Sequence, residues 1–204
     1  MDRLISIPQG TIHAQVAGEG PAVLLVHGYH PDNSWQVWEH NLQAFVAAGF
    51  TVYALDMIGY GMSPGERLDH AQQAAALLAL MDAEALPAAT IGGVSWGGLV
   101  ALQTALIAPA RVERLILVDS AGAGHLTEEQ LESITCPTLV VWGEDDSVIP
   151  LATAAWFGAA IPHSSVETIP DVTTQPGVPP WGGHHPMRFK SEEFNEIVTQ
   201  FLGK

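Results

Sequence analysis

The amino-acid sequence predicts an α/β fold, with a mostly parallel sheet and helices on both of its faces. Two observations support this class. Short strand-like runs alternate with longer helix-like segments along the chain, which is typical of strands joined by crossover helices. Some of the short runs are apolar throughout, as in strands buried on both faces. With 204 residues, of which 48% are hydrophobic, the chain can bury one full core, so residues 1–204 are expected to form a single domain.

The first half of the chain is predicted to begin with a hairpin and then to enter the buried part of the sheet. Gln9-Gly10 is the turn of that hairpin. Strands are expected at residues 4–8, 12–16, 23–26 and 51–55. One helix precedes the last of these, because apolar residues recur at helical spacing: Trp38, Leu42, Phe45 and Val46. Gly49 can end this helix in a left-handed conformation.

The second half continues the alternation. Further strands are expected at residues 88–92, 115–118, 138–142 and 166–169, which brings the expected total to about eight. Helices are expected at residues 69–86, 96–108 and 151–160, with a short one near 127–133. The last helix should open near Ser191, which can cap it, with Glu192 and Glu193 favourable in its first turn. Its apolar face points to the core.

Composition excludes several classes of function. The formal net charge is −15, and the seven Lys and Arg residues form no cluster, so binding to nucleic acid or to an anionic membrane is not expected. No apolar stretch reaches the length of a membrane span, and no signal peptide is visible. The one cysteine, Cys136, cannot form an internal disulfide. These features favour a cytoplasmic location.

A serine lies at a position that suits a nucleophile. Gly93-x-Ser95-x-Gly97 stands between a predicted strand and a predicted helix, where a sharp turn would hold the hydroxyl clear of the sheet. Small residues at 93 and 97 let the neighbouring chains pass closely. A serine hydroxyl is a poor nucleophile at neutral pH, so it needs a base to take its proton and a group to orient that base.

The chain resembles the α/β-hydrolase family from about residue 11 to its end. The resemblance rests on motifs in the order that the family has them: His27-Gly28, Asp56-x-x-Gly59-x-Gly61-x-Ser63, the serine motif, Gly143-x-x-Asp146 with Pro150, and Gly183-His184-x-Pro186. Each motif follows a predicted strand. The resemblance implies a Ser-His-Asp triad and an acyl-enzyme intermediate, and it implies no cofactor.

By this resemblance His184 is the base, because it follows a glycine directly and precedes a proline by two residues. The adjacent His185 is the alternative, otherwise a solvent-facing or pocket-wall residue. Asp146 is the expected orienting acid, since it lies three residues after Gly143, although Glu144 and Asp145 precede it in the same acidic run. Asp119, at the end of an earlier strand, is the other candidate for this role.

Two backbone N–H groups are expected to bind the oxyanion of the reaction. One is that of Trp96, directly after the nucleophile. The other, by resemblance, is that of Tyr29, after His27-Gly28. His27 is expected to hold its loop together rather than to act in catalysis. No HExxH, CxxC, GxGxxG or GxxxxGK[ST] pattern occurs, so neither a metal nor a nucleotide is expected.

Many relatives carry a helical cap between the sixth strand and the acid-bearing strand, but here only residues 121–137 are available. The chain is therefore expected to lack a substantial cap and to have an open pocket. Its walls are predicted from residues 29–35, 121–126 and 171–183, with His30 and Trp181 as candidate pocket residues. A homodimer could cover the exposed apolar surface.

The predicted function is hydrolysis of small to medium carboxylic esters. Three alternatives use the same triad: a cofactor-free perhydrolase, a thioesterase and a C–C bond hydrolase. A non-catalytic ligand-binding protein on the same fold is the alternative from another class.

Overall fold

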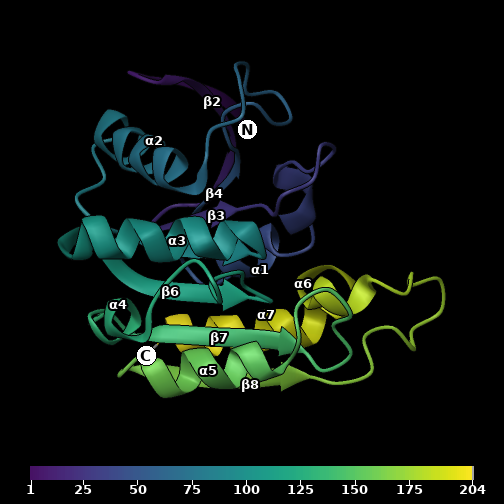
Figure 1. The fold of residues 1–204 in the computed structure, drawn as a ribbon. Coiled ribbons are helices and arrows are strands. Elements are labelled where there is room, and N and C mark those ends of the chain that lie inside the picture. Colours follow the sequence, from purple (N-terminus) through teal and green to yellow (C-terminus); the bar gives the residue numbers. More distant parts are fainter. Residues whose placement is uncertain (204) are drawn as a thin grey trace.

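A computed structural model describes residues 1–203 and shows one eight-stranded sheet in the order β1-β2-β4-β3-β5-β6-β7-β8, which confirms the predicted fold class (Figure 1). The strands are β1 (Asp2–Ile7), β2 (Gly10–Ala17), β3 (Ala22–Val26), β4 (Thr51–Asp56), β5 (Ala89–Val94), β6 (Val112–Val118), β7 (Thr138–Gly143) and β8 (Ser164–Ile169). β1 and β2, and β2 and β4, pair antiparallel. Every other neighbouring pair is parallel, so the strands from β4 to β8 end at one edge.

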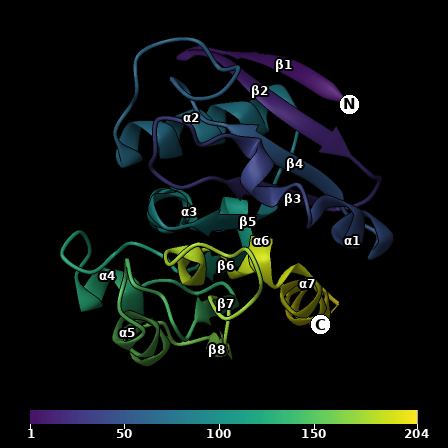
Figure 2. The same ribbon diagram turned by 90° about the vertical axis from the view of Figure 1, so that its right-hand side faces the viewer.

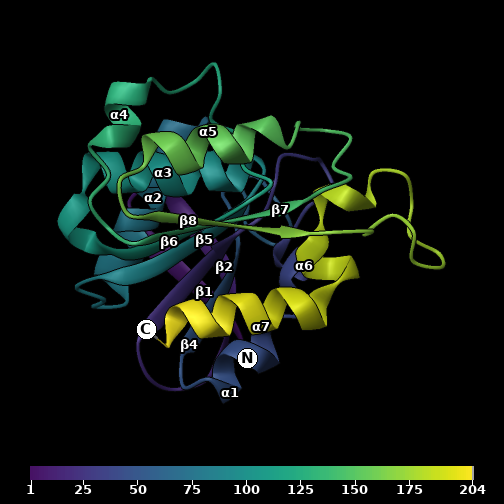
Figure 3. The same ribbon diagram turned by 90° about the horizontal axis from the view of Figure 1, so that it is seen from below.

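Helices cover both faces of the sheet. α2 (His70–Ala83), α3 (Trp96–Ile107), α4 (Glu128–Glu132) and α5 (Ala152–Ala160) lie on one face, whereas α1 (Leu42–Ala47) and α7 (Ser191–Leu202) lie on the other (Figure 3). The structure also has the 3₁₀ turns η1 (Trp35–Trp38), η2 (Pro109–Arg111) and η3 (Gly182–His184), and the short helix α6 (Pro186–Phe189). α6 sits over the edge where the parallel strands end (Figure 2).

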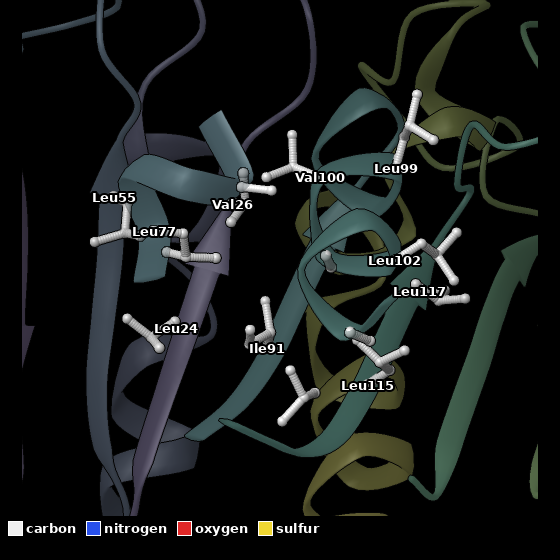
Figure 4. Close-up of a cluster of buried hydrophobic side chains, with 14 of the residues drawn as sticks. Leu24, Val26, Leu55, Leu77, Ile91, Leu99, Val100, Leu102, Leu115 and Leu117 are labelled. Atoms are coloured by element: carbon white, nitrogen blue, oxygen red, sulfur yellow. The ribbon is translucent and has the colours of Figure 1, made fainter. Parts of the chain in front are cut away.

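The core has one apolar cluster on each face, and the alternation of side chains along β3 shows why. Leu24 and Val26 join the cluster under α2 and α3, while Val23 and Leu25 join the one under α1 and α7. All four are at most 1% exposed, as a central parallel strand requires. Figure 4 shows the first cluster, in which Leu77 of α2 and Leu102 of α3 face the strands.

One predicted helix and one predicted cap are wrong, although the last helix begins at Ser191 as expected. The helix expected across residues 38–46 is divided into η1 and α1. Ser34 accepts the N–H of Gln36 and starts a 3₁₀ turn, and the Asn41 side chain then donates to the carbonyl oxygen of Met187 at 2.8 Å, so the break packs against α6. At the other end of the chain, Ser191 lies inside α7 and does not cap it, because α6 leads into α7 through Lys190.

The segment between β6 and β7 holds only one short helix, α4, which agrees with the prediction that no large cap is present. α4 is capped at both ends of its first turn, since Thr127 accepts from the Gln130 N–H and the Gln130 side chain accepts from the Thr127 N–H. The edge where β5 to β8 end is therefore left to the connecting loops, and it is there that the predicted site residues lie.

Candidate active site

Ser95 stands on a strained turn between β5 and α3. Its backbone has φ 55° and ψ −123°, a region that costs a non-glycine residue about 1–3 kcal/mol and that persists only where the surroundings fix it. Here the Ser95 N–H donates to the carbonyl oxygen of Val118 at 2.9 Å, and the Ser95 carbonyl oxygen accepts the N–H of Ala121 at 2.9 Å. The end of β6 therefore holds the turn from both sides.

The glycines of the serine motif are required by space. A Cβ on Gly93 would lie 2.2 Å from the carbonyl group of Gly97, and one on Gly97 would lie 2.4 Å from the carbonyl oxygen of Val26. Neither backbone atom can move without displacing β3 or α3. A Cβ on Gly28 would lie 3.3 Å from the Cβ of Ser95, so the loop after β3 packs directly against the serine.

His184 and Asp146 form a buried hydrogen-bonded pair. His184 Nδ1 lies 2.8 Å from Asp146 Oδ2, and the two side chains are 6% and 0% exposed. The other carboxylate oxygen of Asp146 accepts the N–H groups of Val148 at 2.7 Å and Ile149 at 3.1 Å. Because the carboxylate is fixed by its own loop, it fixes the imidazole ring in turn, with Nδ1–H as the donor and Nε2 left available.

The three acidic residues after β7 have three different partners, which distinguishes between them. Glu144 accepts from the hydroxyl of Thr168 on β8 at 2.7 Å. Asp145 accepts the N–H of Thr173 at 2.7 Å and also the hydroxyl of Thr173, so it anchors the loop after β8. Asp146 is the member of the run that pairs with a histidine, as the spacing from Gly143 predicts.

The acid loop and the histidine loop meet backbone to backbone. A Cβ on Gly143 would lie 2.0 Å from the carbonyl oxygen of Gly183, and one on Gly183 would lie 2.5 Å from the carbonyl oxygen of Asp145. This contact brings His184 to Asp146 although the two residues are 38 positions apart in the sequence.

The loop after β3 presents a backbone donor beside Ser95. His27 is fully buried, its Nδ1 donates to the carbonyl oxygen of Gly28 at 2.8 Å, and its Nε2 accepts the N–H of Met57 at 3.1 Å. Burial lowers the pKa of His27, so the ring is neutral and serves as a brace. The Tyr29 N–H that follows makes no hydrogen bond within residues 1–203. The N–H of Trp96, as the first of α3, has no partner inside the helix.

Asp119 lies beneath the pair, directly after β6. It is 0% exposed and has a positive φ of 42°. Its Oδ1 accepts the N–H of Gly143 at 2.9 Å, whereas its buried Oδ2 has no hydrogen-bond partner in the described chain. Burial, and then the negative charge of Asp146, raises the pKa of Asp119 well above its ordinary value. His184 Nδ1 is bonded to Asp146 and not to Asp119, so Asp146 is the residue in position to orient the imidazole.

These three side chains form the one group of potential metal ligands found among residues 1–203, with one ligand atom each of Asp119, Asp146 and His184 lying within 4.8 Å of one another. In this group His184 Nδ1 and Asp146 Oδ2 are already bonded to each other. The arrangement is therefore that of a hydrogen-bonded pair with a third carboxyl group beside it, and we assign no metal to it.

A pocket of about 430 Å³ connects the parts of the site. Ser95 and His184 both line it, and so do His30 and Trp181, the two predicted pocket residues. The other lining residues are Gly28, Tyr29, Asn33, Val37, Val148, His185 and Arg188. The Ser95 hydroxyl and the His184 ring make no hydrogen bond to each other in the described residues. In many enzymes a catalytic hydrogen bond of this kind forms only when substrate is bound.

Part of the predicted pocket wall is wrong. No residue from 121 to 126 lines the pocket. Gly122 packs against Phe157 of α5, to which its Cβ would be 2.5 Å, and the ring of His125 lies 5.8 Å from that of His70. This segment is therefore held toward α5 and α2. Two residues that line the pocket could not be predicted from sequence patterns. Arg188 belongs to none of the motifs, and Val148 merely follows the acid by two positions.

Comparison with known proteins agrees with this architecture. Residues 21–134 match the family described as alpha/beta hydrolase fold. An uncharacterized protein of Mycobacterium tuberculosis is 43% identical over 113 residues, which cover 53% of this chain and 31% of that protein. The 2-hydroxy-6-oxo-6-phenylhexa-2,4-dienoate hydrolase of Comamonas testosteroni is 35% identical over 129 residues, which cover 60% of this chain and 45% of that enzyme. The matches thus span less than half the length of these relatives.

A solved structure agrees over nearly the whole chain. The crystal structure of a predicted CIB-like hydrolase from Thermoplasma acidophilum superposes with a TM-score of 0.85 at 24% identity, over 99% of this chain and 97% of that one. The chain therefore belongs to the α/β-hydrolase fold family. Within residues 1–203, none of the helices is both long and apolar enough to cross a membrane.

Proposed function

We propose that the chain is a serine hydrolase that acts on small to medium carboxylic esters. The observation that carries the proposal is the fixed pair of His184 and Asp146, of which His184 lines the same pocket as a serine on a strained turn. A buried carboxylate that holds an imidazole in one tautomer is what a serine hydroxyl needs in order to lose its proton.

The reaction follows from the roles of these groups. Ser95 Oγ attacks the ester carbonyl carbon while His184 Nε2 takes the hydroxyl proton, and the N–H groups of Tyr29 and Trp96 receive the developing oxyanion. The tetrahedral intermediate collapses, and the alcohol leaves with the proton from His184. A water molecule then gives its proton to His184 and attacks the acyl-enzyme, which releases the acid and restores Ser95.

The test compares hydrolysis of p-nitrophenyl butyrate by the wild type, Ser95→Ala and Ser133→Ala. Ser133 is an exposed serine after α4, and its hydroxyl donates to the Gln130 carbonyl oxygen at 2.6 Å, so it is a matched control outside the pocket. We expect Ser95→Ala to lower kcat by at least about 10⁴-fold and Ser133→Ala to leave it unchanged. Equal turnover by wild type and Ser95→Ala would refute the nucleophile. Tight ligand binding without turnover by the wild type would favour a binding protein.

A second candidate function is favoured by one relative. The Comamonas testosteroni enzyme, 35% identical over 129 residues, is named for hydrolysis of 2-hydroxy-6-oxo-6-phenylhexa-2,4-dienoate. A ketone has no ester oxygen to leave, so hydrolysis of this compound at its oxo group would break a C–C bond. The same triad could serve this reaction. Loss of the dienoate absorbance with the wild type but not with Ser95→Ala, together with no turnover of p-nitrophenyl butyrate, would select this candidate.

A further inference from the structure

The pocket differs in charge from the rest of the chain. The whole sequence has 22 acidic and seven Lys and Arg residues, for a formal net charge of −15. None of the residues that line the pocket is acidic, however, and one of them is Arg188. The other titratable groups that line it are His30, His184, His185 and Tyr29, none of which is a carboxylate. A cationic pocket in an acidic protein attracts an anion locally, although the distant field repels it.

Arg188 has no partner of its own within residues 1–203. It lies on α6, four residues after His184, and is exposed. Three other cations pair with carboxylates: Arg3 with Glu84, Arg111 with Asp82 and Lys190 with Glu193. Among residues 1–203 the guanidinium of Arg188 has no ion-pair or hydrogen-bond partner, and it lies 5.7 Å from the centre of the Phe189 ring. Its fork of N–H donors matches the two oxygens of a carboxylate.

His185 provides a second unused polar group beside Arg188. Its Nδ1 is buried and has no hydrogen-bond partner in the described chain. Burial, and then the neighbouring charges of His184 and Arg188, lowers the pKa of His185 to about 4, so the ring is neutral at pH 7 and carries one N–H to donate. Because the Nδ1 atom itself is buried, a ligand meets only the part of the ring that lines the pocket, and the neutral ring brings no charge that would compete with Arg188.

We propose that Arg188 and His185 form an anion subsite of the pocket, and that the substrate is an ester carrying a second, ionised carboxyl group. The proposal rests on the proposed esterase and deepens it by naming the substrate class. In this arrangement the ester carbonyl lies at Ser95 while the free carboxylate binds the guanidinium of Arg188 beside the ring of His185. Trp181, whose ring is 5.4 Å from that of His185, forms the apolar wall beside the subsite.

Two substrates test on which side of the ester bond the negative charge must lie. The mono-p-nitrophenyl ester of glutaric acid carries it on the acyl part, and 3-carboxy-4-nitrophenyl butyrate carries it on the alcohol part. For each, kcat/KM is divided by kcat/KM for p-nitrophenyl butyrate. We expect Arg188→Gln to lower this ratio by about 10- to 100-fold for one of the two, as the loss of a charge-assisted hydrogen bond would.

The control variant is Arg114→Gln, which removes the same charge from β6, outside the pocket. It should leave the ratio unchanged. Because Arg188 is exposed, added salt should lower the wild-type ratio toward that of Arg188→Gln. If Arg188→Gln leaves the ratio unchanged for both charged esters, the anion subsite is refuted while the esterase stands.

A binding measurement keeps the two proposals apart. Glutarate is titrated calorimetrically into Ser95→Ala and into Ser95→Ala combined with Arg188→Gln, with no turnover needed. Binding that is at least about 10-fold weaker in the double variant supports the subsite even if no ester is hydrolysed. Equal affinity in the two variants, or no binding to either, overturns it.

Discussion

Asp119 and Asp146 follow the ends of two neighbouring strands, β6 and β7, and a carboxyl oxygen of each lies within 4.8 Å of the other. The two carboxyl groups nevertheless differ in the hydrogen bonds that they accept. Asp146 accepts three hydrogen bonds, from His184, Val148 and Ile149. Asp119 accepts one, from Gly143, and its second oxygen has none in the described chain. Burial, and then the negative charge of Asp146, raises the pKa of Asp119, whereas the hydrogen-bond donors of the site converge on Asp146.

Asp119→Asn should stabilise the protein increasingly as the pH rises above about 4. The pKa of Asp119 is raised in the folded state, so the unfolded chain releases this proton at a lower pH than the folded one. Wild-type stability therefore falls between the ordinary Asp pKa and the folded pKa, by about 1.4 kcal/mol per pH unit at most. Asparagine has no such equilibrium, keeps an acceptor for Gly143 and tolerates the positive φ.

Urea unfolding of both proteins at pH 4 to 8 measures this difference. Asp119→Leu serves as the control, because it also removes the ionisable group but leaves the Gly143 N–H without an acceptor, at a cost of about 1–3 kcal/mol. A stability difference between wild type and Asp119→Asn that stays constant over the whole range would show that Asp119 is ionised in the folded protein.

Asp146→Asn should lower kcat for a hydrolysed ester by about 10⁴-fold, because an amide no longer fixes the tautomer of His184. Glu144→Gln is the matched control from the same acidic run, since the Glu144 carboxylate accepts from the Thr168 hydroxyl on the edge strand β8. We expect that control to keep at least about half of the activity, in line with the small effects of exposed polar contacts. Similar losses in both variants would mean that the acid has been assigned to the wrong residue.

His185 should make the protein less stable in acid. Its pKa is lowered to about 4 by burial and by its charged neighbours, so between pH 6.5 and 4 the unfolded chain binds a proton that the folded chain does not. Stability is therefore lost as the pH falls through this range, by up to about 3 kcal/mol. In His185→Phe this part of the pH dependence should disappear, whereas it should persist in a variant of the exposed His163. Parallel curves for wild type and His185→Phe would contradict the assignment.

Gly97→Ala should destabilise the protein, because its Cβ would lie 2.4 Å from the carbonyl oxygen of Val26 and 2.5 Å from that of His27. Overpacking of this kind costs about 1–3 kcal/mol and lowers the Tm of a chain of this size by several degrees. Gly203→Ala is a suitable control, since its Cβ would meet nothing closer than 3.4 Å. A Tm within about 1 °C of the wild type would show that β3 and α3 can separate at little cost.

Trp181→Ala should change substrate preference more than stability. Trp181 is 47% exposed and lines the pocket, and its ring lies 5.8 Å from that of Phe189. Loss of a half-exposed apolar wall should reduce kcat/KM most for esters with long acyl chains, by about 10-fold for each 1.4 kcal/mol of lost contact. Rates are measured for p-nitrophenyl acetate, butyrate and octanoate. An unaltered profile across the three would remove Trp181 from the pocket wall.

The fold could be predicted well from the sequence because the pattern of apolar residues in each strand indicates how that strand is buried. The run of residues 23–26 is apolar at every position, as is typical of a strand that is covered on both faces. The structure places this strand between two apolar clusters. The helix near residues 38–46 could not be predicted as two pieces, because its break depends on the bond from Asn41 to the carbonyl oxygen of Met187, far along the chain.

In the candidate site, too, some residues could be predicted from local sequence patterns and others depend on contacts between distant parts of the chain. Ser95, Asp146 and His184 belong to local patterns of glycine and strand ends that the sequence displays directly. Arg188 and Val148 line the pocket only because η3 and α6 follow the last strand and turn over the edge of the sheet. The segment 121–126 lies away from the pocket because Gly122 fits against Phe157, a contact between distant positions that no local pattern encodes.

The contact between Gly143 and Gly183 has a consequence for how this protein can vary. The backbone contact between these two glycines positions His184. The chain between β8 and η3 therefore only has to connect these two elements. Apart from Thr173, which Asp145 anchors, and Trp181, which lines the pocket, its length and composition are free to change, since closing a longer loop costs little entropy. New recognition elements can be inserted there while Asp146 and His184 stay together, which makes this connection the natural place for evolution or an engineer to refit the pocket.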